Sequence, residues 1–142
     1  MKQVSRGYSL IEILVVISVI TLLMTVAGPR IVKLFTGGRK ASTLTNMQAL
    51  KGALISYNMD TGSFPTKKDG LDALINRPST KGAAEKWDGP YLSGAKEIPA
   101  DAWGNEFIYE IPPMRFKEDR AFTIISLGAD GEESDDDLHV GE

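Results

Sequence analysis

Residues 8–28 form an apolar stretch with a single charged residue, Glu12. A helix of about 20 such residues spans roughly 30 Å, the thickness of the hydrocarbon core of a bilayer. Lys2 and Arg6 precede the stretch without any acid, which predicts a cytoplasmic N-terminus and places the following chain across the membrane. An ordinary signal peptide has a shorter apolar core followed by a small-residue cleavage site, whereas this stretch runs on into TVAGPRIVKLF. The stretch therefore indicates a permanent anchor or a more specialised segment.

The overall composition is that of a globular chain: 142 residues, 42% hydrophobic and 25% charged, with a net charge of −3. This charge balance argues against nucleic acid as a partner. The absence of cysteine excludes disulfides, thiol nucleophiles and cysteine-bound metals, and the single histidine, His139, lies in an acidic segment. A histidine-based triad or a polyhistidine metal site is therefore hard to build, and we expect no enzymatic activity.

Glu12 needs a partner, because a carboxylate in an apolar helix costs a few kcal/mol unless it is neutralised. Arg6 is six residues away and is poorly placed to pair with it. Cleavage after Gly7 would create an α-amino group on Tyr8, four residues before Glu12, and staggered copies could pair that amine with a neighbour's Glu12. The alternative is a tolerated or protonated glutamate near the membrane interface.

The string RGYSLIEILVVISVI resembles the class III leader of type IV pilin-like proteins: a short basic leader ending in Gly, an aromatic residue, then Glu at the fifth mature position. The resemblance implies that residues 1–7 are a leader, that a prepilin peptidase cuts after Gly7, and that Tyr8 becomes N-methylated. It also assigns Glu12 and Pro29 to assembly, Pro29 lying where the family often has a helix-bending proline. Tyr8-Ser9 replaces the usual Phe-Thr and leaves this interpretation intact.

Residues 29–60 predict an amphipathic continuation of the apolar helix. Apolar residues recur there at spacings of three and four (Leu44, Met47, Leu50 and Leu54). Asp60-Thr61-Gly62 is a stop signal, so we expect one helix from residue 8 to about 59, roughly 75 Å long if unbroken. Pro29 removes one helical hydrogen bond and is expected to kink or locally melt the helix.

Residues 61–142 predict a small globular head. We expect a short helix over residues 67–77 that ends before Pro78, with Asp69 or Thr66 as its cap. Alternation predicts one strand around residues 107–111 and a second over residues 121–127. A long N-terminal helix packed on a small antiparallel sheet gives an α+β, pilin-like fold.

Three strings in this head narrow the resemblance: ALISYNMDTGSFPTKKDGLDALINRP, GPYLSGAKEIPADAWGNEFIYEIP and ISLGADG. They are similar to the major pseudopilin of the type II secretion system. The resemblance implies a structural subunit, anchored once in the bacterial inner membrane with its head in the periplasm, that polymerises into the pseudopilus driving type II secretion. Implied partners are further copies of the chain, minor pseudopilins, the prepilin peptidase, an inner-membrane assembly platform and, before assembly, membrane lipid.

Two alternatives remain from the sequence. One is a type IV pilin or competence pseudopilin, although such pilins more often carry a C-terminal disulfide. The other is a membrane-anchored binding protein or enzyme that does not polymerise.

The string SLGADGEESDDDL gathers hard oxygen ligands around a Gly turn, as calcium sites do, but such a run alone is more often a solvated acidic terminus. The resemblance implies one calcium ion in this C-terminal loop. Its ligands would be three carboxylates and two backbone carbonyls (Asp130, Asp136 and Asp137; Leu127 and Glu132). Asp135-Asp136 could replace Asp136-Asp137 as the consecutive pair.

Overall fold

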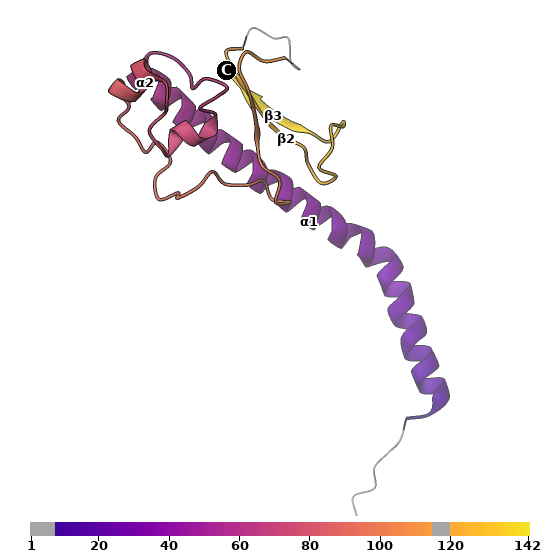
Figure 1. Cartoon of the computed structure of the whole chain (residues 1–142). Helices are drawn as coiled ribbons and strands as arrows, with labels where there is room; N and C mark the ends of the chain where they lie inside the picture. The colour runs from indigo at the N-terminus through magenta and orange to yellow at the C-terminus, as the bar shows by residue number, and fades with distance from the viewer. Residues whose placement is uncertain (1–7, 115–119) are drawn as a thin grey trace, which may run out of the picture. The chain divides into compact units, whose positions relative to one another are not determined.

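The longest element of the fold is helix α1, Leu10–Thr61 (Figure 1). The structure is a computed structural model, which describes residues 8–114 and 120–142 apart from the side chains of residues 29 and 31–33. α1 is helical through position 29, so the backbone there is not melted. Contacts divide the chain into an N-terminal unit ending at Gly38 and a C-terminal unit, Arg39–Glu142. The single long helix predicted from the sequence is confirmed.

Both ends of α1 are set by local hydrogen bonds. The Ser9 hydroxyl accepts a bond from the Ile11 N–H at 3.3 Å, so Ser9 caps the first turn. At the other end, the Thr61 hydroxyl donates to the Tyr57 carbonyl at 2.8 Å, and Gly62 follows with a positive φ of 81°. Gly62 provides the left-handed residue that commonly terminates helices, as the stop signal predicts.

The large apolar side chains of α1 before Gly28 are exposed. Leu10–Gly28 has a mean hydropathy of 2.7, and none of it is buried inside the protein. Its hydroxyls bond back to the helix: Ser18 donates to the Leu14 carbonyl at 2.7 Å, and Thr21 donates to the Ile17 carbonyl at 2.8 Å. A polar group in lipid must be satisfied within its own segment, so this helix is suited to apolar surroundings on every side.

In the C-terminal unit, one face of α1 forms one side of the core. Met47, Leu50 and Leu54 are fully buried there, as the stripe of apolar residues predicts. They pack with residues from the loops and the sheet (Leu71, Leu74, Phe107, Phe122, Ile124 and Leu138). Because each large apolar side chain contributes about 1.5–3 kcal/mol when buried, this face firmly attaches the rest of the unit to the helix.

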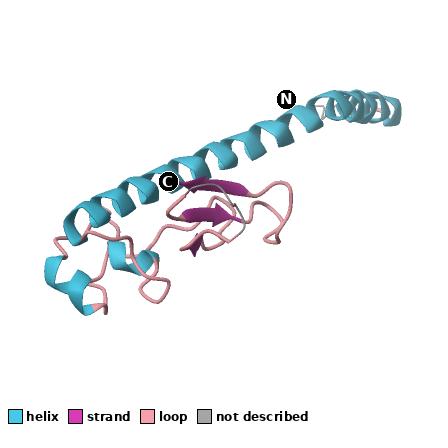
Figure 2. Ribbon diagram, turned by 90° about the horizontal axis from the view of Figure 1, so that it is seen from above, coloured by secondary structure: helices cyan, strands magenta, loops and turns pink. Residues whose placement is uncertain are grey.

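The sheet has three antiparallel strands in the order β1-β2-β3 and lies along one side of α1 (Figure 2). The strands are β1 (Ile108–Glu110), β2 (Thr123–Ser126) and β3 (Leu138–Gly141). Tyr109 pairs with Ile124, which in turn pairs with Val140. β2 is central and buried along its whole length. The predicted α+β fold is confirmed, with β3 as a strand that the sequence did not predict, because its short alternation follows directly on the acidic run.

The helix predicted over residues 67–77 is shorter than expected. It is a 3-10 turn, η1 (Leu71–Leu74), and a second helix, α2 (Lys81–Lys86), follows beyond Pro78. Asp69 does not cap η1. Its carboxylate instead accepts hydrogen bonds from residues 79 and 80 farther along the chain, which draws this segment into a compact turn.

Candidate functional site

The N-terminal end of α1 carries the residues predicted for processing and assembly. Tyr8 is 78% exposed, and Glu12 lies exposed in the first turn of the helix. Gly7, the predicted cleavage site, falls outside the described residues. Within residues 8–114 and 120–142, no basic side chain lies within ion-pair distance of Glu12. The arrangement therefore presents a solitary carboxylate at the start of an apolar helix.

The predicted calcium ligands lie on the loop between β2 and β3, residues 127–137, hereafter the β2–β3 loop. Asp130 Oδ1 accepts a hydrogen bond from the Glu132 N–H at 3.1 Å, which forms a local turn. Asp136 Oδ2 accepts one from the Ala129 N–H at 3.3 Å and so joins the two ends of the loop. Asp137 Oδ1 accepts one from the Ser134 N–H at 3.4 Å. The loop thus turns several carboxylates onto its own backbone.

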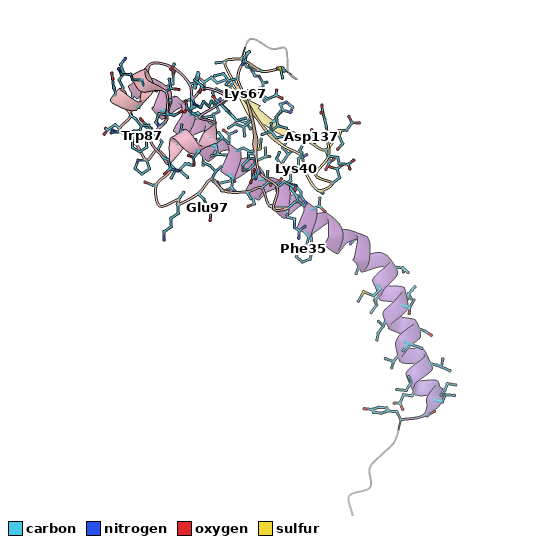
Figure 3. All side chains as sticks on the ribbon, in the orientation of Figure 1. Phe35, Lys40, Lys67, Trp87, Glu97 and Asp137 are labelled. Carbon is cyan, nitrogen blue, oxygen red and sulfur yellow. The ribbon has the colours of Figure 1, made fainter. Side chains whose placement is uncertain are left out.

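Asp136 is the most constrained of these acids. The Ser134 hydroxyl and the Ala129 N–H both donate to its carboxylate, and together with Lys40 of α1 they hold the pKa of Asp136 below its usual value. A methyl group added to Gly128 would lie 2.5 Å from Asp136 Oδ2, so the carboxylate packs directly on a backbone that only glycine leaves open. Figure 3 shows Lys40 on α1 and Asp137 on the loop.

The donor chemistry of the loop suits a hard cation, because every candidate ligand is a carboxylate or carbonyl oxygen. In the described part of the chain, however, no three acidic or histidine side chains converge as a metal cluster would. Leu127 is half-buried at the end of β2, whereas Glu132 is exposed. Asp135 and Asp136 are both exposed and Asp137 is half-buried, and Asp136 and Asp137 each accept a hydrogen bond from within the loop.

Asp101 organises a hydrogen-bonded cluster that the sequence analysis did not single out. Its side chain, in a residue 6% exposed, accepts bonds from the Asn105 N–H at 2.8 Å, the Trp103 N–H at 3.0 Å and the Ser126 hydroxyl at 2.7 Å. Burial opposes ionisation, but these three donors outweigh it and hold the pKa of Asp101 below its usual value. The sequence pattern that could have revealed this cluster is Asp101 followed by Gly104 and Asn105, which is typical of a turn capped by an aspartate side chain.

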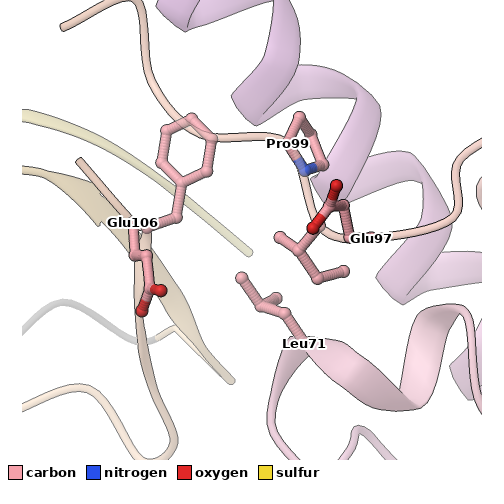
Figure 4. Close-up of a pocket in the computed structure, with 6 residues that line it drawn as sticks. Leu71, Glu97, Pro99 and Glu106 are labelled. Carbon is pink, nitrogen blue, oxygen red and sulfur yellow. The ribbon is translucent and has the colours of Figure 1, made fainter. Parts of the chain in front are cut away.

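A cavity of about 300 Å³ opens elsewhere in the C-terminal unit (Figure 4). Leu71, Pro99 and Phe107 give it apolar walls, and Glu97 and Glu106 are exposed acids at its edge. Its lining contains no histidine, serine or lysine. The cavity therefore lacks the nucleophile and base combinations that acyl or phosphoryl transfer would need.

Comparisons with known proteins match nearly the whole chain. Residues 30–141 match the family described as "Type II secretion system (T2SS), protein G", and residues 2–28 match the "Prokaryotic N-terminal methylation motif". The second range includes Gly7, Tyr8 and Glu12.

Individual relatives give the same result. The chain is 32% identical to a type II secretion system core protein G of Pseudomonas aeruginosa over 144 residues, covering 99% of this chain and 96% of the relative. It is 35% identical to one of Xanthomonas campestris over 126 residues, covering 88% and 79%. A crystal structure of the major pseudopilin from the type 2 secretion system of enterohaemorrhagic Escherichia coli aligns with a TM-score of 0.57 at 24% identity, covering 72% of this chain and 86% of that one. That likeness supports the fold.

Proposed function

The chain belongs to the type II secretion system protein G family, and from this premise we propose how its helix and its acidic loop serve a pseudopilus. The chain is a structural pseudopilin, not an enzyme, and it is a membrane-anchored member of the secretion machinery. The match over residues 30–141 favours secretion over the type IV pilin that the sequence left open.

The observation that carries the proposed assembly is the exposed apolar surface of α1 before Gly28, with Glu12 as its only charge. Such a surface is stable either in lipid or against other copies of the same helix. The subunit would therefore rest in the inner membrane with the C-terminal unit in the periplasm, and would then pack helix against helix in the filament. The prepilin peptidase, the inner-membrane assembly platform and minor pseudopilins are the partners this pathway requires.

Cleavage after Gly7 and methylation of Tyr8 would leave a positively charged terminus beside the carboxylate of Glu12 on a neighbouring copy. Two unit charges about 4 Å apart at an effective dielectric constant near 20 attract by about 4 kcal/mol. That attraction is available only when adjacent helices are correctly staggered. The pair would therefore set the register between copies, while apolar packing supplies most of the remaining stability.

Glu12→Gln tests this role, because it removes the charge and keeps the shape. In cells that make the whole secretion machinery, we expect cross-linked oligomers of the variant to fall at least ten-fold. Glu12→Asp keeps the charge and should retain part of the assembly, and Ser18→Ala on the same helix is the control. Unchanged oligomers in Glu12→Gln would refute the pairing, and an intact mass showing only the uncut chain would refute cleavage at Gly7.

We further propose that the β2–β3 loop binds one calcium ion through Asp130, Asp136 and Asp137, with the carbonyls of Leu127 and Glu132. The oxygen-only donor set and the placement of Asp136 over Gly128 support the assignment. The loop carries six acids between residues 130 and 137, so a divalent ion would relieve their mutual repulsion. The ion would stabilise the C-terminal unit and take no part in a reaction.

Calcium binding is measured by thermal unfolding of the full chain in detergent micelles, in EGTA and in calcium chloride. An ion present at one hundred times its Kd stabilises the folded state by about 2.7 kcal/mol, so the Tm should rise by several degrees. Asp130→Ala should abolish the rise, and Glu85→Ala, which removes an exposed acid from α2, should keep it. An equal Tm in both buffers would reject the site.

A further inference from the structure

The Asp101 cluster lies between α1 and the β2–β3 loop and contacts both. On the α1 side, the Ala102 N–H donates to the Thr43 hydroxyl at 3.1 Å, and the Asn46 amide donates to the Ala100 carbonyl at 3.2 Å. Thr43 is fully buried, so the first of these bonds is sheltered from water. The segment around Asp101 is thus fixed to the helix independently of the loop.

On the loop side, the contacts converge on the turn formed by residues 128–131. Asn105 Nδ2 donates to the Gly128 carbonyl at 2.9 Å, and the Gly128 N–H donates to the Ser126 hydroxyl at 3.3 Å. Asn105 Oδ1 lies 3.5 Å from the position that a Cβ on Gly131 would occupy. Asn105 therefore bonds to one end of the turn that carries Asp130 and lies near its other end.

The two glycines of this turn have positive φ angles, 67° at Gly128 and 69° at Gly131. Glycine populates such angles but also many others, so a turn built on two glycines needs outside contacts to hold one conformation. The Asn105 amide provides such a contact at Gly128, and Asp101 fixes Asn105 by accepting from its backbone N–H at 2.8 Å and its side-chain amide at 3.4 Å. The turn is consequently held by Asn105, which the buried carboxylate of Asp101 fixes in place.

We propose that Asp101 and Asn105 are positioning residues that hold the β2–β3 loop ready for its cation and transmit the loop's ordering to α1. This inference rests on the proposed calcium site. A loop whose backbone is already fixed pays less conformational entropy when the ion binds, and therefore binds it more tightly. Groups that orient metal ligands without touching the metal commonly change metal affinity by about 10–100-fold when they are removed.

The test is calcium titration of the full chain in detergent micelles by calorimetry. Asn105→Ala removes the amide that holds Gly128 and should raise the Kd for calcium about ten-fold. Asp69→Asn is the matched control, because Asp69 is another aspartate with several donors but serves the turn before α2. It should lower the Tm in EGTA while leaving the calcium Kd unchanged, as a merely structural residue would.

Amide hydrogen exchange gives a second measurement. Calcium should slow exchange at the Ala102 and Asn105 N–H groups of the wild-type chain, although neither residue is a proposed ligand. In Asn105→Ala, protection by calcium should stop at the loop and should not reach Ala102.

The outcomes separate the two proposals. No calcium binding by the wild-type chain would overturn the calcium site and this inference with it. Wild-type binding with an unchanged Kd in folded Asn105→Ala would overturn the inference alone. If Asn105→Ala does not fold, Ser126→Ala removes the 2.7 Å bond to Asp101 together with the acceptor of the Gly128 N–H, and an unchanged Kd in that variant would overturn the inference equally.

Discussion

Asp69 should stabilise the C-terminal unit in a pH-dependent manner. Its carboxylate accepts hydrogen bonds from the Thr66 hydroxyl at 2.7 Å, the Ser79 N–H at 2.9 Å and the Ser79 hydroxyl at 2.7 Å, and from the Thr80 hydroxyl. The Thr80 and Ser79 bonds contribute most to holding the pKa of Asp69 far below its usual range. The charged form is therefore the one that the folded state selects.

Asp69→Asn keeps the shape of the side chain and removes the charge. The amide oxygen of the variant can still accept hydrogen bonds from Ser79. The hydroxyls of Thr66 and Thr80 would instead face the amide NH2 group, which is a donor, so they must rotate to accept hydrogen bonds from it. Hydrogen bonds to a charged group contribute about 1.5–3 kcal/mol each, and the partial exposure and rotation of the hydroxyls reduce the net loss here to about 1–2 kcal/mol. The Tm at pH 7 should fall by roughly 5–10 °C.

The pH dependence gives the decisive measurement. A carboxyl group with a depressed folded pKa contributes stability that is complete above its unfolded pKa, about 3.9, and is lost as the pH falls toward its folded pKa. Wild type and Asp69→Asn should therefore differ at pH 7 and converge as the pH falls below about 4. Other carboxylates cancel in this difference, which we would follow in EGTA through the fluorescence of Trp87, whose indole donates to the Ala73 carbonyl at 2.8 Å.

A difference in Tm between the two proteins that stays constant from pH 7 to about pH 2.5 would refute the reasoning, because ionisation of Asp69 would then contribute nothing.

Two further substitutions probe the loop and the core. Gly128→Ala forces a residue with a side chain to a φ of +67° and directs its Cβ against Asp136 Oδ2, so the calcium-dependent rise in Tm should shrink. Gly94 also has a positive φ, but a Cβ added there would meet no atom within 4 Å. Gly94→Ala should therefore lose stability without changing the calcium-dependent rise in Tm. Equal effects of the two on the calcium response would contradict the placement of Asp136. Leu54→Ala should cost about 2–5 kcal/mol in chemical unfolding, because Leu54 is fully buried, whereas Gln48→Ala on the exposed face should cost less than about 0.5 kcal/mol. Similar costs for both would show that this face of α1 does not form the core.

The features read correctly from the sequence depend on spacing along a single segment. The apolar stretch, the solitary Glu12, and the recurrence of Met47, Leu50 and Leu54 each follow from helical geometry alone, so α1 was predicted nearly to its ends. The stop after Thr61 is equally local, because Gly62 acts through its own backbone angle.

The tertiary structure decided which polar groups meet. Ala102 bonds to Thr43 across 59 positions of the chain, and Asn105 bonds to Gly128 across 23. Asp69 looked like a helix cap, yet Ser79 and Thr80 supply its donors because the chain folds back past Pro78. A carboxylate accepts from whichever donors the fold brings within about 3 Å, and the fold is settled by the packing of the whole core, so no local pattern specifies these partners.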